Sequence, residues 1–214
     1  MRVRFLGDAA LCVAVDDVAP FEANARVHLV ADVLRKAQVP GVRDVVPGMT
    51  TLTVHVDPLR TDLAAIEAVV ARTAARAMPG ADVPDAAVHH VRVRYGGDAG
   101  PDLDAVADAA GLSPAEVVEI HAGAVYRVCF LGFLPGFAYL GLVHDALRMP
   151  RRATPRTRVP AGSVAIADVF TGVYPSDSPG GWHIIGRTDA ALFDAHRQPP
   201  ARFAPGDAVR FMEA

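Results

Sequence analysis

Residues 132–186 are rich in glycine and proline, and this feature most constrains how the chain can fold. The stretch holds eight glycines and six prolines in 55 residues, against usual frequencies of roughly 7% and 5%. Long helices do not cross such a stretch, because proline removes a backbone donor and glycine carries a high conformational entropy. Short apolar segments within and after it are expected as strands, at 125–133, 162–167, 173–174, 183–186 and 208–212. The pattern favours a compact β-barrel with functional loops.

Residues 1–85 differ in texture, because strand-like and helix-like segments alternate there. A helix is expected from Pro20, where a missing N–H costs no hydrogen bond, and it should end at Pro40-Gly41. A second helix is expected over about 62–77, with Thr61 as its N-cap and Pro79-Gly80 closing it. The economical arrangement packs both helices on one face of a small antiparallel sheet. The strands of this sheet are expected at 2–6, 9–15, 42–46 and 51–56.

The second half of the chain, 86–214, opens with an alternating strand at 88–95 and a helical patch at 102–110. Its clearest local signal is Ser113-Pro114-Ala115-Glu116, a capping box in which the serine and the glutamate each bind the other's backbone N–H. A helix should begin there and end near Ala122-Gly123. The fold class is therefore α+β, with an N-terminal domain at 1–85 and a β-barrel domain at 86–214.

Charge and composition exclude several classes of function. The net charge is −3 and the pI is near 6.2, whereas a general nucleic-acid binder usually carries a clearly basic domain. No apolar run reaches the ~18 residues of a membrane helix, and the N-terminus does not read as a signal peptide. A cytoplasmic protein is expected. Cys12 and Cys129 lie far apart in apolar runs, which favours two buried free thiols over a disulfide.

Several standard catalytic motifs do not occur in the sequence. It contains neither a P-loop nor a G-x-S-x-G elbow. The eight histidines are scattered, and His89 and His90 are neighbours on an expected strand, so their side chains point to opposite faces. No metal site is predicted.

The first candidate segment is residues 130–141, which combine glycines with aromatic residues. Glycine permits close backbone approach to a ligand, and the aromatic rings offer a wall for it. Pro135, Gly136 and Tyr139 are the candidate binding residues here. The alternative is a barrel corner packed by Phe133 and Phe137.

The second candidate segment is a run of arginines without acids. Five arginines fall within eleven residues, at 148, 151, 152, 156 and 158. Guanidinium groups match carboxylates and phosphates, and the three prolines at 150, 155 and 160 stiffen the loop. Arg151, Arg152, Arg156 and Arg158 are the candidate anion-binding residues. The alternatives are a solvated loop, or arginines paired with the acids of a partner.

The third candidate segment is residues 171–188, which carry hydroxyl groups and the only tryptophan of the chain. Thr171, Tyr174, Ser176 and Ser178 offer neutral donors, and backbone N–H groups around Gly180 and Gly181 can hold an oxyanion. The alternative is a turn-rich hairpin with a buried Trp182.

His121 lies near the end of the capped helix. A helix C-terminus favours a protonated histidine, so His121 is either a general base or a helix-end cap. Together with Tyr174 it is a candidate catalytic residue.

These segments, taken in order, resemble the family formed by the B subunit of bacterial 5-oxoprolinase, also known as allophanate hydrolase subunit 1, which includes the KipI sporulation-kinase inhibitor. The resemblance covers almost the whole chain and is densest over 121–188. It rests on the runs Phe-Leu-Gly-Phe-x-Pro-Gly-Phe-x-Tyr-Leu, Pro-Arg-Thr-x-Val-Pro-x-Gly-Ser and Ser-Pro-Gly-Gly-Trp, with further matches at 6–11, 45–47, 95–103 and 205–211.

The resemblance implies a small N-terminal α/β sandwich of ferredoxin-like type and a C-terminal cyclophilin-like barrel. It also implies two partners, a C-type subunit like allophanate hydrolase subunit 2 and an A-type subunit of the LamB/YcsF type. Such a complex opens 5-oxo-L-proline to glutamate with ATP. The arginine run and the Gly-Gly-Trp loop would then hold phosphate or carboxylate near the partner, whichever of the chains binds ATP.

Two departures from the family pattern leave other functions open. Phe170 stands where the family commonly has glutamine, and Leu140-Gly141-Leu142-Val143 replaces the usual Leu-Gly-Gly-Leu. A hydrolase or carboxylase subunit for a related amide or urea is therefore an alternative, as is a KipI-like inhibitor of a sensor histidine kinase. Peptidyl-prolyl isomerase chemistry finds no support in the sequence, because a shared fold does not imply a shared function.

Overall fold

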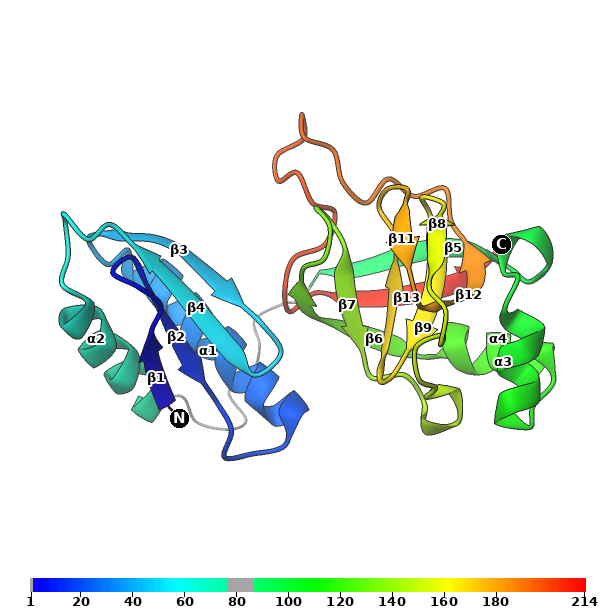
Figure 1. Ribbon diagram of the computed structural model, residues 1–214, viewed down its shortest axis with the longest axis horizontal. Coiled ribbons are helices and arrows are strands. Elements are labelled where there is room, and N and C mark those ends of the chain that lie inside the picture. Colours follow the sequence, from blue (N-terminus) through cyan, green and yellow to red (C-terminus); the bar gives the residue numbers. More distant parts are fainter. Residues whose placement is uncertain (1, 77–86) are drawn as a thin grey trace. The chain divides into compact units, whose positions relative to one another are not determined.

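The computed structural model describes residues 2–76 and 87–214, and the chain divides into two compact units, Met1–Asp85 and Ala86–Ala214 (Figure 1). Each unit has its own hydrophobic core. The expected helix stop at Pro79-Gly80 lies outside the described residues. Within those residues, no helix is long and apolar enough to cross a membrane.

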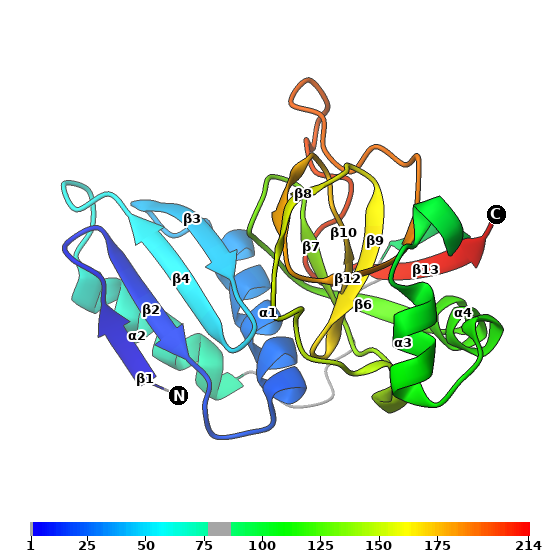
Figure 2. The ribbon, with the colours of Figure 1, turned by 45° about the vertical axis from the view of Figure 1, so that its right-hand side comes forward.

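The first unit is an α/β sandwich of four strands and two helices. The sheet order is β1-β2-β4-β3, with all neighbours antiparallel. β2 and β3 consequently run parallel with β4 between them, which is the split β-α-β unit of ferredoxin-like folds. Both helices pack on the same face of the sheet (Figures 1 and 2). The elements are β1 (Arg2–Phe5), β2 (Ala10–Ala14), α1 (Pro20–Ala37), β3 (Val42–Pro47), β4 (Thr51–Val56) and α2 (Leu63–Arg76).

Two helix boundaries in this unit differ from the sequence prediction. α1 ends before Gln38, whose left-handed backbone (φ 44°) stops the helix ahead of Pro40-Gly41. The N-cap of α2 is Asp62 rather than Thr61, because the Asp62 carboxylate accepts the Ala64 N–H at 3.0 Å. Thr61 instead closes a turn by donating its backbone N–H to the Asp57 carbonyl.

The second unit is a closed seven-stranded barrel with the order β10-β7-β6-β13-β5-β12-β9. All neighbours are antiparallel except β13 and β5, which run parallel. The barrel strands are β5 (Val88–Tyr95), β6 (Val125–Leu131), β7 (Ala138–Gly141), β9 (Ser163–Ala167), β10 (Phe170–Val173), β12 (His183–Arg187) and β13 (Ala208–Glu213). The expected α+β class with a C-terminal β-barrel is confirmed.

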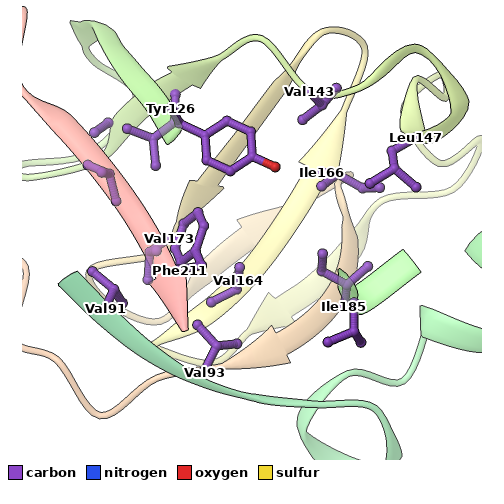
Figure 3. Packing of buried hydrophobic residues seen from close by; sticks show 14 of the residues in the cluster. Val91, Val93, Tyr126, Val143, Leu147, Val164, Ile166, Val173, Ile185 and Phe211 are labelled. Atoms are coloured by element: carbon purple, nitrogen blue, oxygen red, sulfur yellow. The ribbon is translucent and has the colours of Figure 1, made fainter. Parts of the chain in front are cut away.

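Apolar side chains from every side of the barrel fill its interior (Figure 3). Val93 comes from β5, Val164 and Ile166 from β9, Ile185 from β12 and Phe211 from β13, and each is at most 1% exposed. Burial of these side chains is the main favourable contribution to the stability of the barrel.

Two helices, α3 (Leu103–Ala110) and α4 (Pro114–Gly123), pack against each other beside the barrel, with α4 against β13 (Figures 1 and 2). The capping box of α4 is confirmed. Glu116 N–H donates to Ser113 Oγ at 3.3 Å, and Ser113 N–H donates to Glu116 Oε2 at 2.7 Å.

Part of the arginine run is a strand rather than a loop. β8 (Arg156–Val159) pairs with β11 (Ser178–Gly180) in a separate two-stranded ribbon. β8 is not predicted from the sequence because its partner strand lies some twenty residues further on. Its arginines also leave no clear alternation of apolar and polar residues. Short 3₁₀ turns occur at η1 (Gly97–Ala99) and η2 (Asp145–Leu147).

Candidate functional site

The three candidate segments of the sequence converge on one cluster of aromatic residues. Phe137, from the first segment, lies 5.3 Å from Tyr174 and 5.4 Å from Trp182, both in the third segment, between ring centroids. These rings meet edge to face, the arrangement that the aromatic quadrupole favours. The cluster is backed by Val159, which ends β8 in the second segment. Residues from 130 to 188 are therefore brought together by the barrel and the ribbon.

The outer part of this cluster consists of Phe130, Tyr139 and Phe170. Phe130 stacks on Tyr139 at 4.2 Å with an interplanar angle of 15°. Phe170, at the start of β10, meets both rings edge-on at 5.9 and 5.6 Å. The residue that departs from the family pattern thus belongs to the aromatic cluster itself.

Backbone contacts join the arginine segment to the Gly-Gly-Trp loop. The Arg152 N–H donates to the Gly181 carbonyl at 2.8 Å, and His183 Nε2 donates to the Pro150 carbonyl at 2.9 Å. Glycine is required at 180, because a Cβ there would overlap the Tyr174 hydroxyl and ring. The two segments form one connected surface beside Trp182.

Asp102, which the sequence prediction missed as a site residue, is the hub of this surface. Its carboxylate accepts two hydrogen bonds from Arg156 at 2.8 Å, one from Arg152 at 2.9 Å and one from the Ile184 N–H at 2.7 Å. Its side chain is 6% exposed. Burial raises the pKa of Asp102, but the hydrogen bonds from Arg156 and Ile184 and the two guanidinium charges outweigh it and hold that pKa below its usual value.

In the sequence, Asp102 stands out only by its position just before the helix α3. An aspartate there would ordinarily be assigned to capping the helix, yet Asp102 makes no side-chain cap hydrogen bond. Its carboxylate instead accepts hydrogen bonds from Arg152 and Arg156, which lie 50 and 54 positions further along the chain.

The expectation that the arginine run is free to bind an anion needs correction. Each arginine has a carboxylate partner in this chain: Arg148 with Asp145, Arg151 with Asp168, Arg158 with Asp177, and Arg152 and Arg156 with Asp102. This pairing with acids of the same chain is not among the alternatives that the sequence suggests, which are a solvated loop or the acids of a partner. Charge is nevertheless not balanced at Asp102, because two guanidinium groups share one carboxylate there.

Two buried donors of the candidate segments have no hydrogen-bond partner among the described residues, Ser178 Oγ and Arg152 Nε. Ser178 is only 9% exposed and lies on β11, two residues before the Gly180 that faces Tyr174. An unpaired buried polar group carries a desolvation cost of about 1–3 kcal/mol. A ligand would reach these donors only by displacing the side chains that cover them, and it would break no existing hydrogen bond of the two atoms.

The structure does not place His121 in this site. His121 is 0% exposed and stacks on Phe211 at 4.7 Å, and burial lowers its pKa to about 3. It is therefore a neutral core residue and not the protonated helix-end group or solvent-facing base that its position suggested. The favourable helix dipole is outweighed by the loss of hydration.

Hydrogen bonds assign the tautomer of His121. The Thr171 hydroxyl donates to the Ala165 carbonyl at 3.1 Å, so its oxygen accepts from His121 Nε2–H at 2.8 Å. His121 Nδ1 then accepts the Tyr95 hydroxyl at 2.7 Å. Thr171, another predicted site residue, is consequently an interior residue as well, with an exposed fraction of 0%.

The remaining predicted residues divide between the cluster and its edge. Tyr174 is buried, which raises its pKa, while a hydrogen bond to the Trp182 backbone opposes that rise. Pro135 and Gly136 form the turn between β6 and β7, where a Cβ on Gly136 (φ 82°) would meet Phe193 Cβ at 2.7 Å. Phe133, beside that turn, is 59% exposed. No group of three metal-ligating side chains occurs in the described part of the chain.

Comparison with known proteins shows relatives over the whole chain. The family described as carboxyltransferase domain, subdomain C and D, matches residues 1–203. The B subunit of 5-oxoprolinase from Escherichia coli O157:H7 is 40% identical over 214 residues, covering 99% of this chain and 95% of that protein. The protein of the same name from Bacillus subtilis (strain 168) is 36% identical over 226 residues, covering 99% and 94%.

Solved structures also match this chain over nearly its whole length. The crystal structure of TTHA0988 matches with a TM-score of 0.82 at 39% identity, covering 100% of this chain and 40% of that chain. This chain therefore spans 40% of the length of TTHA0988. Urea carboxylase of Kluyveromyces lactis matches with a TM-score of 0.76 at 16% identity, over 99% of this chain and 21% of that chain. The second likeness concerns the fold alone.

This chain, a ferredoxin-like sandwich followed by a closed barrel, thus belongs to the class described as carboxyltransferase domain, subdomain C and D. Within that class, the chain belongs to the family of 5-oxoprolinase B subunits. The resemblance found in the sequence is confirmed.

Proposed function

We propose that this chain is a non-autonomous subunit of an ATP-dependent 5-oxoprolinase in the cytoplasm. The reaction converts 5-oxo-L-proline, ATP and water to L-glutamate, ADP and phosphate. A C-type subunit like allophanate hydrolase subunit 2 and an A-type LamB/YcsF subunit are expected to complete the complex. The names of the relatives support this proposal. The observation that carries it is the convergence of the three segments around Trp182, together with two donors of these segments that lack a partner among the described residues.

The charge around Asp102 suits the carboxylate of 5-oxoproline. Arg152 and Arg156 share one carboxylate, so one positive charge remains for a monoanionic ligand. The Arg152 Nε–H and the Ser178 hydroxyl, which have no partner among the described residues, are the donors we assign to it once the ligand displaces the side chains that cover them. Charge-assisted hydrogen bonds of this kind are about twice as strong as neutral ones.

The flat lactam ring would lie against the aromatic cluster, with Tyr139 and Trp182 at its boundary. Lactam opening is uphill for a stable five-membered ring, and ATP supplies the driving force by turning the carbonyl oxygen into a better leaving group. The residues of this chain bind and orient the substrate. With these two donors, the site fits a single carboxylate, and we assign no nucleotide site to this chain.

A related cyclic amide or urea is the second candidate substrate. Phe170 packs edge-on against Tyr139 and Phe130, where family members commonly carry a glutamine amide. A binding site that lacks the glutamine amide discriminates against a substrate that needs a hydrogen bond from this amide. This observation favours a substrate that presents a less polar group on the Phe170 side.

The test is glutamate release from 5-oxoproline and ATP by this chain co-purified with the C-type subunit, after addition of the A-type subunit. We expect glutamate release that disappears when this chain is omitted. Release that continues without this chain would overturn the proposal. A stable complex that turns over another amide or a urea, but not 5-oxoproline, would select the second candidate.

The matched variants are Ser178→Ala and Ser176→Ala. Ser178 Oγ is buried without a partner among the described residues, so its removal breaks no existing hydrogen bond, whereas Ser176 is exposed. We expect Ser178→Ala to raise the KM for 5-oxoproline about tenfold, the loss of one hydrogen bond to a charged group. Ser176→Ala should leave the KM unchanged. Equal KM values for both variants would remove Ser178 from the site.

A further inference from the structure

The barrel unit carries a concave surface that none of the site residues lines. It is an open hollow of about 620 Å³, formed along α4 and the segments at its two ends. Its apolar floor consists of Leu112, Ile120 and Ala124, which are half-buried and pack against the barrel core. A hollow whose floor belongs to the core holds its shape without a ligand, which suits it to receive an apolar side chain.

The rim of the α4 hollow is acidic. Glu116 and Glu119 line it from α4, and His144 faces them from the segment before η2. The Glu116 carboxylate is bound to Ser113 in the capping box, which fixes its position. Glu119 is exposed, so its charge is available to a partner.

The surroundings strengthen this charge. Residues 96–126 contain six acids and no lysine or arginine. One of the six, Asp102, is neutralised by arginines, whereas Asp98, Asp104 and Asp108 are exposed on or before α3. The exposed charged side chains of α3 and α4 are therefore all acidic. A surface that carries only negative charge attracts and orients a positively charged partner.

We propose that the α4 hollow is the docking site for a cationic amphipathic segment of the C-type partner subunit. An apolar side chain of that segment fills the floor over Ile120, and a lysine or arginine beside it pairs with Glu119. Apolar anchors flanked by complementary charge are a recurring way to recognise a helix or peptide. This inference rests on the proposed function, because that function supplies the partner.

The hollow can be blocked without disturbing the fold. Gly123 lines it, and a Cβ built there meets no atom within 4 Å. Gly123→Phe therefore places a ring over the floor while leaving the core intact. Its control is Ala115→Phe, which adds the same ring at an exposed position of α4 outside the hollow.

The rim is tested by charge reversal. Glu119→Lys changes the sign of the available charge, and Asp108→Lys makes the same change at an exposed position on α3 that does not line the hollow. The dissociation constant of each variant for the purified C-type subunit is measured by interferometry between about 50 and 300 mM salt, where screening of exposed charges changes strongly. Thermal unfolding of each variant checks that the chain is folded.

We expect Gly123→Phe and Glu119→Lys to weaken binding at least about tenfold, while both controls bind like the unaltered chain. The unaltered chain should also lose affinity with salt more steeply than Glu119→Lys. Equal affinities for all four variants would overturn the docking site while leaving the complex established. Failure of the unaltered chain to bind the C-type subunit would instead overturn the proposed function, and the docking site with it. Salt-sensitive self-association that Glu119→Lys abolishes would assign the hollow to a second copy of this chain and overturn the proposal.

Discussion

Replacing Asp102 with asparagine tests whether the buried carboxylate holds the arginine segment against the barrel. The substitution keeps the volume of the side chain but removes its charge. One asparagine oxygen still accepts, whereas the new amide group turns two donors toward guanidinium groups that are themselves donors. Arg156, which binds both carboxylate oxygens at 2.8 Å, loses its bidentate geometry.

The expected loss of stability follows from burial. Removing one partner of a buried ion pair costs about 3–5 kcal/mol. The arginine side chains are 32% and 25% exposed, so water compensates part of the loss, and we expect about 3 kcal/mol. For a unit of this size that corresponds to a fall in the melting temperature of about 10 °C.

Trp182 makes the measurement specific to the barrel unit. It is the only tryptophan of the chain and is 5% exposed in the aromatic cluster, so its fluorescence follows unfolding of this unit. The control is Asp189→Asn, because Asp189 forms a similar two-bond pair with Arg94 at the surface, at 3.0 and 3.3 Å, with a side chain 79% exposed. That pair should contribute less than about 1 kcal/mol. Equal losses for the two variants would refute the argument from burial.

The pH dependence supplies a second check on Asp102. Its pKa is lower in the folded chain than its usual value, so its contribution is complete above the pKa of the unfolded chain, near 3.9. The contribution is lost as the pH falls through the folded pKa. The difference in stability between the unaltered chain and Asp102→Asn should therefore shrink below about pH 4. A difference that stays constant to pH 2 would contradict a charged Asp102.

Three further predictions follow from the core and the site. His121 has a pKa of about 3 in the folded chain against 6.5 ordinarily, so it stays neutral when folded, and the unfolded chain takes up a proton as the pH falls below 6.5. The free energy of unfolding should therefore fall from pH 6.5 toward pH 3, and the part of this pH dependence that comes from His121 should be absent in His121→Phe. The ring protons of His121 should not titrate above pH 5 by NMR. Gly180→Ala should cost about 2 kcal/mol by overpacking, because its Cβ would lie 2.9 Å from the Tyr174 ring, whereas Gly132→Ala, with its nearest contact at 3.9 Å, should cost less than about 0.5 kcal/mol in urea unfolding; equal costs would contradict the close contact. Phe170→Gln should change kcat/KM for 5-oxoproline in the reconstituted complex while the Trp182 transition stays intact, and an unchanged kcat/KM would place residue 170 outside the substrate pocket.

Local signals in the sequence predict the elements well. The capping box at Ser113 and Glu116 fixes the start of α4, because both partners lie within one helical turn. The strand at 88–95 is predicted with its observed bounds, since alternation of apolar residues is a local pattern. The cap of α2 shows the limit of such signals. Thr61 and Asp62 are adjacent, both can cap, and only the turn with Asp57 decides between them.

Residues with polar side chains in the core are the ones that the sequence misassigns, because their partners lie far along the chain. The local sequence places His121 at a helix end, but Tyr95 and Thr171, 26 and 50 positions away, bind its two ring nitrogens. Asp102 precedes a helix in the same way, but Arg152, Arg156 and Ile184 bind it. In both cases the local preference is worth about 1 kcal/mol, less than the cost of leaving a buried polar group unpaired. The long-range partner therefore decides.

Partners that lie far along the chain also explain why the sequence indicates an anion site at the arginine run whereas the structure shows ion pairs there. In the sequence, five cations without acids within eleven residues indicate an anion site. In the folded chain, acids from four other positions reach them, and only at Asp102 do two arginines share one acid. The excess charge is thereby confined to Asp102 and its two arginines, of which Arg152 also donates its backbone N–H to the Gly181 carbonyl next to Trp182. The carboxylate site of the proposed function is accordingly assigned to this pair of arginines.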